Sequence, residues 1–215
     1  MTSDDTGVEK RRKLACFTLV GLVLVAGLVF LLLVLLLKPS KAPFFLQDCS
    51  NYSFNLTQAS NTYNTTSFTT VSCFMQLTIA TRNSDGNLGI YYHKFKVFAT
   101  YREQQVTRKT ELPTSYLSGK ETAVWSPFLY GSSVPVSPAS ANQFNEDMSA
   151  GWLLVYVRVD GRIKWKLGSL FWRSHKVKAS CPAYLKFGGQ AATTSGGNGY
   201  AAAVNSFKDC NVELY

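Results

Sequence analysis

The sequence predicts an all-β fold, an antiparallel β-sandwich with one short helix, preceded by one transmembrane helix. Three observations predict it. Residues 14–37 form an apolar run without a charge. Beyond that run, short stretches of alternating apolar and polar residues recur between turn signals, which is the pattern of half-buried strands. Four cysteines also follow it, and an even number is typical of a disulfide-containing domain in an oxidising compartment.

The apolar run is long enough to cross a membrane. Residues 14–37 contain 11 Leu, 5 Val and 2 Phe. As a helix they would extend roughly 36 Å, more than the ~30 Å hydrocarbon core of a bilayer. A cleaved signal peptide has an apolar segment of only about 7–15 residues, followed by small residues at the cut. Here residues 40–42 are followed by Pro43, a poor residue after a cut. We therefore expect an uncleaved anchor.

The basic residues that flank the anchor predict its orientation. Residues 10–13 are all Lys or Arg, whereas only Lys38 and Lys41 lie near the other end. Because basic residues favour the cytosolic side, residues 1–13 are expected to be a cytosolic tail. Residues 38–43 then form a linker, and residues 44–215 an extracellular domain. Cys16, at the cytosolic edge of the helix, fits either a small apolar residue or a site of S-palmitoylation.

Three N-glycosylation acceptors lie on the side that the charges predict to be external. Asn51, Asn55 and Asn64 each begin an Asn-x-Ser/Thr sequence. All three follow the anchor within a short Ser/Thr/Asn-rich stretch. They support the predicted orientation, and each is a predicted glycosylation site.

The sequence after the linker predicts a succession of strands. Residues 44–57 alternate loosely, and residues 72–81 place their apolar side chains at odd numbers, as in a half-buried strand. Residues 83–87 are a turn cluster around Asp-Gly. Residues 89–101 form the next strand, on which we expect one face to carry Tyr91, His93, Phe95, Val97 and Ala99.

Residues 153–167 predict a hairpin. Apolar residues occupy every second position on both sides of Asp160-Gly161, and Asp-Gly between two alternating runs is typical of a two-residue turn. The intervening positions are mostly basic, so one outer face is expected to carry Arg158, Arg162, Lys164 and Lys166.

One helix is predicted among the strands, followed by a loop. Ser137 can cap it, Pro138 suits its first position, and Gly151 can end it. Residues 188–199 are rich in Gly, Ala, Thr and Ser and predict a flexible loop. Residues 204–214, which contain Cys210, then form a last short strand.

The sequence predicts no catalytic, metal or cofactor site. The two histidines, His93 and His175, have basic neighbours and no third ligand at a suitable spacing. The Gly-Gly pairs lie in low-complexity sequence rather than between a strand and a helix. The external cysteines read as disulfide partners rather than nucleophiles.

The charge favours acidic partners. The formal net charge is +9, which attracts anionic lipid heads, acidic polysaccharides or nucleic acid, and the anchor and the glycosylation acceptors argue against nucleic acid. Residues 158–186 contain eight basic residues and one acidic residue, Asp160. They form either an ordinary solvated strand face or a patch for an acidic polymer or anionic lipids.

Several motifs give the chain a resemblance to a known family. Residues 83–93 (NSDGNLGIYYH), 126–131 (SPFLYG), 159–168 (VDGRIKWKLG) and 208–214 (KDCNVEL) resemble, in this order, plant harpin-induced and disease-resistance membrane proteins. These carry a late embryogenesis abundant domain of the second subgroup. The sequence departs from the first family motif at two positions, where a Pro and an Asp are replaced by Ser84 and His93.

The resemblance implies an immunoglobulin-like or fibronectin-III-like sandwich at the plasma membrane, without enzymatic activity, acting in plant defence or stress signalling. The sandwich would contact cell-wall polysaccharide or membrane-protein partners. The alternative is a protectant that stabilises membranes under stress, or a lipid-binding domain. Of the three possible disulfide pairings, we expect Cys181 with Cys210, which closes the Gly-rich loop, and Cys49 with Cys73.

Overall fold

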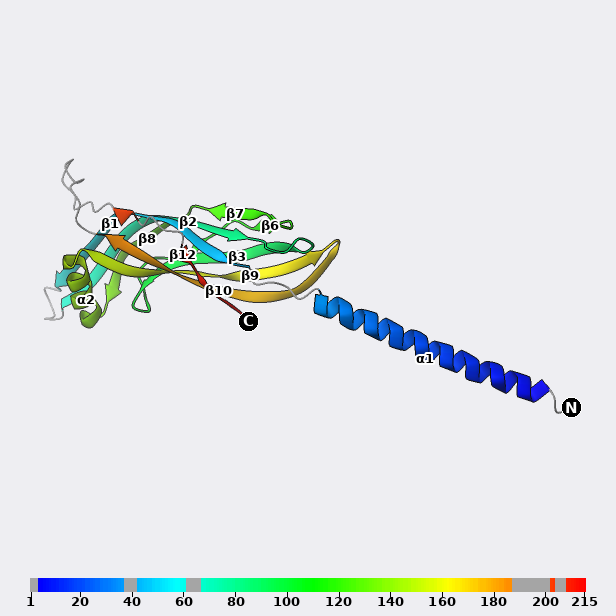
Figure 1. Ribbon diagram of the computed structural model, residues 1–215. Coiled ribbons are helices and arrows are strands. Elements are labelled where there is room, and N and C mark those ends of the chain that lie inside the picture. The colour runs from blue at the N-terminus through cyan, green and yellow to red at the C-terminus, as the bar shows by residue number, and fades with distance from the viewer. Residues whose placement is uncertain (1–3, 37–41, 61–66, 187–201, 204–207) are drawn as a thin grey trace. The chain divides into compact units, whose positions relative to one another are not determined.

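The protein was analysed as a computed structural model, which describes residues 4–36, 42–60, 67–186, 202–203 and 208–215 (Figure 1). The chain divides into two compact units, Met1–Pro39 and Ser40–Tyr215. The first unit is helical and the second contains both β-sheets. The predicted acceptor Asn64 and the predicted loop at 188–199 lie outside the described residues.

The first unit is one helix, α1, at Asp4–Leu36. It contains nearly all of the predicted membrane segment and begins about three turns earlier, so that Arg11, Arg12 and Lys13 are helical as well. Its Arg11–Leu32 segment is long and apolar enough to cross a membrane. Cys16 is exposed on this helix.

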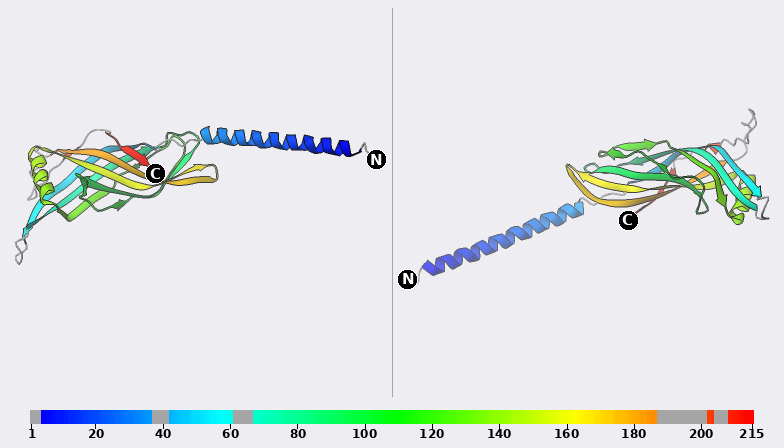
Figure 2. Two further views of the ribbon diagram at one scale, coloured as in Figure 1. Left: turned by 90° about the horizontal axis from the view of Figure 1, so that it is seen from below. Right: turned by 180° about the vertical axis from the view of Figure 1, so that it is seen from behind.

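The second unit contains two antiparallel sheets, seen as layers in Figures 1 and 2. Every strand pair is antiparallel, which confirms the predicted fold class. Sheet A contains β1 (Phe44–Ser60), β2 (Ser67–Arg82), β7 (Thr122–Trp125), β8 (Phe128–Val136), β11 (Ala202–Ala203) and β12 (Lys208–Asp209). Sheet B contains β3 (Gly89–Tyr101), β4 (Gln104–Gln105), β5 (Thr110–Glu111), β6 (Ser115–Leu117), β9 (Trp152–Leu167), β10 (Leu170–Lys186) and β13 (Asn211–Leu214).

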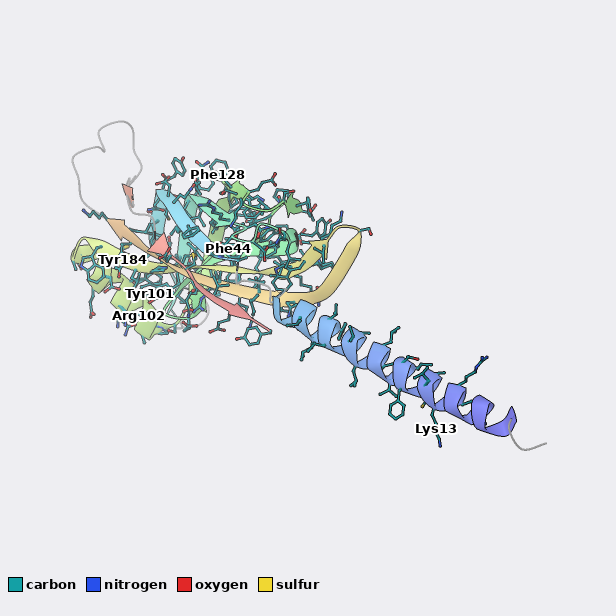
Figure 3. All side chains as sticks on the ribbon, turned by 45° about the vertical axis from the view of Figure 1, so that its right-hand side comes forward. Lys13, Phe44, Tyr101, Arg102, Phe128 and Tyr184 are labelled. Atoms are coloured by element: carbon teal, nitrogen blue, oxygen red, sulfur yellow. A yellow bond between two sulfur atoms is a disulfide. The ribbon has the colours of Figure 1, made fainter. Side chains whose placement is uncertain are left out.

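The core lies between the two sheets. The odd-numbered apolar residues of β2, from Val71 to Ile79, are buried as predicted. Aromatic rings join the layers: the ring centroid of Phe44 on β1 lies 6.2 Å from that of Tyr92 and 5.8 Å from that of Phe95, both on β3. Figure 3 places Phe44 inside the domain and Phe128 at its surface.

The helix α2, at Pro138–Ser149, forms as predicted. The Ser137 side chain accepts a hydrogen bond from the Ser140 amide at 3.1 Å, and Pro138 occupies the first turn. On its buried face, Phe144 stacks on Tyr101 with 3.7 Å between ring centroids, and lies 5.4 Å from the Phe54 ring. The helix therefore covers the end of the core opposite the β9–β10 turn (Figures 1 and 2).

The hairpin predicted at Asp160-Gly161 is wrong. The strand β9 runs unbroken from Trp152 to Leu167, and the chain turns at the following residues, where Gly168 has φ +58°. Gly161 has a different role. A Cβ added there would lie 2.5 Å from the Phe95 ring of the neighbouring β3, so the glycine allows a close approach between strands.

A bulge in β3 explains this approach. His93 pairs with Arg162 and Lys96 with Asp160, so that two residues of β3 face the single residue Gly161. Lys94, the first of the two, has φ 55°. The buried side of β3 consequently changes from even to odd numbers at Phe95. The predicted face is therefore correct from Phe95 onward and wrong for Tyr91 and His93.

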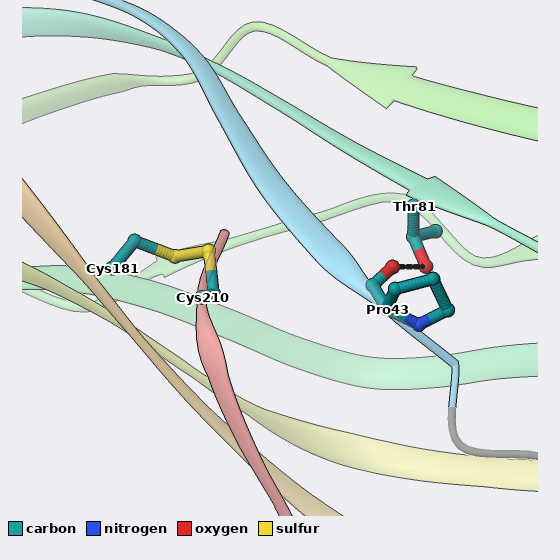
Figure 4. Close-up of a disulfide and its surroundings, with 4 residues drawn as sticks. All are labelled: Pro43, Thr81, Cys181 and Cys210. Atoms are coloured by element: carbon teal, nitrogen blue, oxygen red, sulfur yellow. Dashed lines mark hydrogen bonds between the residues drawn. A yellow bond between two sulfur atoms is a disulfide. The ribbon is translucent and has the colours of Figure 1, made fainter. Parts of the chain in front are cut away.

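One predicted disulfide is present and the other is not. Cys181 is bonded to Cys210 (Figure 4), whereas Cys49 and Cys73 are free and buried. Cys49 lies opposite Leu77, four residues along β2 from Cys73. At about 3.3 Å per residue this offset is roughly 13 Å, well beyond the ~7 Å limit between the Cα atoms of a disulfide.

The C-terminal segment passes from one sheet to the other at Cys210. β12 pairs with β1 in sheet A, and β13 pairs with β10 in sheet B. The Cys210 amide donates a hydrogen bond to the Phe44 carbonyl oxygen at 3.0 Å. Close by, the Thr81 hydroxyl donates to the Pro43 carbonyl oxygen at 2.8 Å (Figure 4). The disulfide thus joins β10 to a segment bonded to the first strand.

Candidate functional site

The face of sheet B that points away from sheet A is strongly basic. On β9, the even-numbered side chains point outward, and strands β3 and β10 place further basic residues beside them. We call this surface the basic face. It comprises Lys94, Lys96, Arg158, Arg162, Lys164, Lys166, Lys176 and Lys178.

Strand pairing brings like charges together at the centre of the basic face. Arg162 lies between His93 on β3 and Lys176 on β10, and each pairs with it directly. Arg162 and Lys176 carry like charges, and like charges directly opposite one another destabilise a sheet. This repulsion lowers the stability of the folded domain. An anion bound over Arg162 would reduce this repulsion.

Three carboxylates neutralise part of this face, two at its margin and one, Asp160, on its middle strand β9. The Arg158 guanidinium contacts Glu103 at 2.6 Å, and the Lys96 ammonium contacts Glu111 at 3.1 Å. Asp160 pairs with Lys96 on one side and with Lys178 on the other. Among the residues described, no carboxylate lies within 4.0 Å of the charged nitrogens of three central residues: Arg162, Lys164 and Lys176.

Two hollows lie on this face. The first, of ≈ 200 Å³, is bordered by six charged residues: Lys94, Lys96, Asp160, Arg162, Lys176 and Lys178. The second, of ≈ 520 Å³, shares Asp160 and Lys178 with it and extends to β13 and Tyr215. The second hollow is also lined by Asp209 and Glu213, so its three carboxylates outnumber its two basic side chains, Arg158 and Lys178. The first hollow is bordered by five basic residues and one carboxylate, and it is therefore the one that suits an anionic ligand.

The pKa of His93 is lowered by burial and by the positive charges around it. Burial lowers the pKa of its imidazole below the ordinary value of 6.5, and the nearby charges of Lys164, Lys94 and Arg162 lower that pKa further. Its Nε2 atom is buried and has no hydrogen-bond partner among the residues described. A neutral imidazole therefore occupies the centre of a cationic cluster.

We predict that protonation of His93 destabilises the domain. The folded state binds this proton more weakly than the unfolded chain, so stability is fully present above pH 6.5 and is lost as pH falls through the lowered pKa. Urea unfolding of the parent and of His93→Gln at pH 7 and pH 5 measures the effect. We expect a smaller loss of stability between the two pH values in His93→Gln, and an equal loss would contradict the prediction.

The structure places the four predicted anion-binding residues on one surface, but not with equal roles. Arg162 and Lys164 lie at its centre, and the Lys166 ammonium lies 5.3 Å from the centroid of the Tyr116 ring. Arg158 is bound to Glu103 at the margin. The contribution of β3 was not predicted, because the sequence alone does not show that β3 lies beside β9 in the sheet.

The predicted glycosylation acceptors differ in their access. Asn51 is 3% exposed, and its backbone pairs with that of the buried Met75. A glycan does not fit at Asn51 in this fold, because the side chain points into the core. Asn55 is exposed on β1, so it is the predicted acceptor that the described structure leaves accessible.

The free thiols are enclosed. Burial raises the pKa of Cys49 to about 12 and that of Cys73 to about 11. The Cys73 thiol donates a hydrogen bond to the Val106 carbonyl oxygen at 3.4 Å. Both are therefore small core residues. In the part of the chain that the structure describes, no group of three or more His, Cys, Asp or Glu side chains could hold a metal ion.

Comparison with known proteins identifies the family. NDR1/HIN1-like protein 12 of Arabidopsis thaliana is 37% identical over 82% of this chain and 80% of its own length. NDR1/HIN1-like protein 1 of the same plant is also 37% identical, over 85% of this chain and 86% of its own length. This chain belongs to the NDR1/HIN1-like family. A third NDR1/HIN1-like protein, number 26, is 33% identical over 78% of this chain. No protein-family model matches the chain.

Family membership confirms the resemblance, and the first motif, residues 83–93, has a clear structural role. Asn83 is fully buried, and its side-chain amide donates hydrogen bonds to the Leu88 and Ser118 carbonyl oxygens at 2.7 and 2.9 Å. It therefore fixes the connection between β2 and β3. Of the two departures from the motif, Ser84 lies in this connection, whereas His93 lies on the basic face and replaces an acidic residue.

Proposed function

We propose that this NDR1/HIN1-like protein is a non-enzymatic, plasma-membrane protein of plant defence or stress response. In this proposal α1 is the anchor, with its N-terminus in the cytosol. The β-sandwich lies outside the cell and binds an anionic polysaccharide of the cell wall. De-esterified pectin is the ligand of this class that we propose, because it presents a regular row of carboxylates.

The observation that carries the proposal is the uncompensated centre of the basic face. Arg162, Lys164 and Lys176 come from two paired strands, and sheet pairing fixes their spacing. The basic face continues along β9 toward Lys166, so several carboxylates of one extended polymer can bind at once. Binding several charges of one chain raises its avidity without any new kind of contact. A carboxylate polymer fits this surface better than a single small anion.

A stress protectant that acts on membranes is the alternative. Anionic lipid heads would also be attracted to the basic face. However, five basic side chains border the first hollow, and Val177 is the one residue of its lining with an apolar side chain, so the lining offers an acyl chain little beyond the stems of charged residues. This favours a hydrated polymer, and liposomes serve as a comparison in the test.

The test compares binding of the full-length protein, purified in detergent, to polygalacturonate and to highly methyl-esterified pectin. We expect binding to polygalacturonate at low salt and weaker binding at high salt, since the Debye length falls from about 10 Å at 0.1 M to about 3 Å at 1 M. The variant Arg162→Gln/Lys164→Gln/Lys176→Gln should bind roughly tenfold more weakly, at several tenths of a kcal/mol per exposed charge pair.

A matched variant controls for net charge. Arg82→Gln/Arg108→Gln/Lys120→Gln removes the same three charges from exposed positions outside the basic face, and it should bind like the parent. Equal weakening in both variants would show that binding depends on overall charge alone and would overturn the assignment of the face. Stronger binding to anionic liposomes than to polygalacturonate would favour the alternative.

A further inference from the structure

A cluster of aromatic rings is exposed on the opposite side of the domain, on the outer face of sheet A. The Phe74 and Phe128 rings are stacked at 5.6 Å with an interplanar angle of 8°, and the Tyr52 ring lies 5.4 Å from that of Phe74. Tyr130 pairs with Phe74 across β2 and β8. We call these four residues, each between 39% and 50% exposed, the aromatic ridge. Contiguous exposed apolar groups usually have an occupant.

The accessible glycosylation acceptor lies on the same face. Asn55 pairs with Ser72, and two residues away on the same side of the strands Ser53 pairs with Phe74. Asn55 and Phe74 are thus diagonal neighbours, which in an antiparallel pair lie roughly 7–8 Å apart, within reach of long side chains. The Phe74 ring is therefore within the reach of a sugar attached to Asn55.

Small side chains form the surface between Asn55 and Phe74. The pairing partner of Asn55 is Ser72, and that of Phe74 is Ser53. The Ser72 hydroxyl accepts a hydrogen bond from the Ser133 amide at 3.0 Å. A sugar ring extending from Asn55 therefore has space above two small side chains and a wall formed by Phe74. A bulge between Asn51 and Ser53 leaves Tyr52 unpaired, and its ring is tilted by 35° to that of Phe74.

We propose that an N-glycan on Asn55 folds back onto the aromatic ridge and packs its first sugars against Phe74. The C–H groups of a pyranose ring carry partial positive charge and are attracted to the negative face of an aromatic ring. The glycan is thus a structural part of the domain, and it covers apolar surface that would otherwise promote self-association. This inference rests on the external location of residues 44–215 in the proposed function.

Substitution of Thr57 gives a sharp test, because it controls the glycan without changing Asn55. In full-length protein made in plant cells, Thr57→Ser keeps the acceptor sequence and Thr57→Ala removes it. Thr57 is exposed, so neither substitution disturbs the core. We expect Thr57→Ala to lack one glycan and to unfold roughly 2–4 °C below Thr57→Ser, the shift that a contact of one aromatic pair gives in a domain of this size.

Two further measurements separate stacking from a general effect of the sugar. In a Phe74→Ala background, the difference in Tm between Thr57→Ser and Thr57→Ala should disappear. In hydroxyl-radical footprinting, Phe74 and Tyr52 should be oxidised more in Thr57→Ala than in Thr57→Ser. Oxidation of Tyr116, which is 49% exposed on sheet B, should not change.

Each contrary outcome has a distinct meaning. A glycan on Asn55 with the same Tm difference in the Phe74→Ala background, or with unchanged footprinting, overturns the inference and leaves the ridge to a second copy or an external glycan. A tag on the N-terminus decides topology independently in sealed microsomes. If protease removes the tag while the sandwich is protected, but Asn55 carries no glycan, only the inference fails. If the tag is spared and the sandwich is digested, the proposed topology fails with it.

Discussion

The double variant Cys181→Ala/Cys210→Ala is expected to lose about 3–4 kcal/mol of unfolding free energy. The two cysteines are 29 residues apart in sequence. Without the bond, the unfolded chain gains the loop-closure entropy that the disulfide removes. Urea unfolding of the purified protein, followed by circular dichroism of the β-sheets, measures the difference.

The cysteine Cys16 provides the control. It is exposed on α1, outside the unit Ser40–Tyr215, so Cys16→Ala should leave the unfolding of the sandwich unchanged. Reduction of the parent with dithiothreitol should reproduce the loss seen in the double variant. Unfolding midpoints that agree between the reduced and oxidised parent would contradict the prediction.

The substitution Gly161→Ala is the second change for which we expect a large effect. Its Cβ would lie 2.5–2.6 Å from three atoms of the Phe95 ring, and Phe95 is 2% exposed, so the ring has little room to move away. Overpacking of this kind costs about 1–3 kcal/mol. Thermal unfolding monitored by circular dichroism measures it.

Two companion variants show whether the contact with Phe95 is the cause. Phe95→Leu combined with Gly161→Ala should cost less than the sum of the two single changes, because the smaller side chain leaves space for the added methyl group. Gly86→Ala is the matched control, since its added Cβ would make only an ordinary contact with Lys120 at 3.6 Å. Additive costs in the double variant would show that the strain at Gly161 has another source.

Elements specified by local signals could be predicted from the sequence. The buried face of β2 follows from strict alternation between Val71 and Ile79, and α2 follows from the cap at Ser137 and from Pro138. In both cases the deciding residues are neighbours along the chain. The Cys181–Cys210 bond was predicted because it closes the Gly-rich loop between the two cysteines, whereas Cys49 and Cys73 depend on the register between β1 and β2, which spacing alone does not give.

The wrong prediction of a hairpin at Asp160-Gly161 has a physical cause. Asp-Gly favours a tight turn locally, but here the glycine is needed because Phe95 of another strand packs on it. The sequence did contain a contrary signal. A two-residue turn would pair Val159 with Arg162 and put Val159 and Ile163 on opposite faces, although both are apolar. The uninterrupted period of two favoured a continuous strand.

The candidate site was predictable only in part, because the sequence shows the alternation within a strand but not which strands are neighbours. The outward residues of β9 follow from alternation, whereas their neighbours His93 and Lys176 are known only once the strand order is known. The aromatic ridge is similar. Phe74 occupies an even-numbered position of residues 72–81, opposite the apolar face, so an aromatic ring on the outer face was a visible signal, but Phe128 joins it only through the pairing of β8 with β2.

The passage of the C-terminal segment between the sheets has a mechanical consequence. In the proposed function, tension between a wall polymer bound to β9 and β10 and an anchor that precedes β1 in the chain would pull sheet B away from sheet A. Such a load would pass from β10 through the Cys181–Cys210 bond to the segment that is hydrogen-bonded to Phe44 and Phe45 at the start of β1. The domain would thus resist extension through a covalent link rather than through side-chain packing alone.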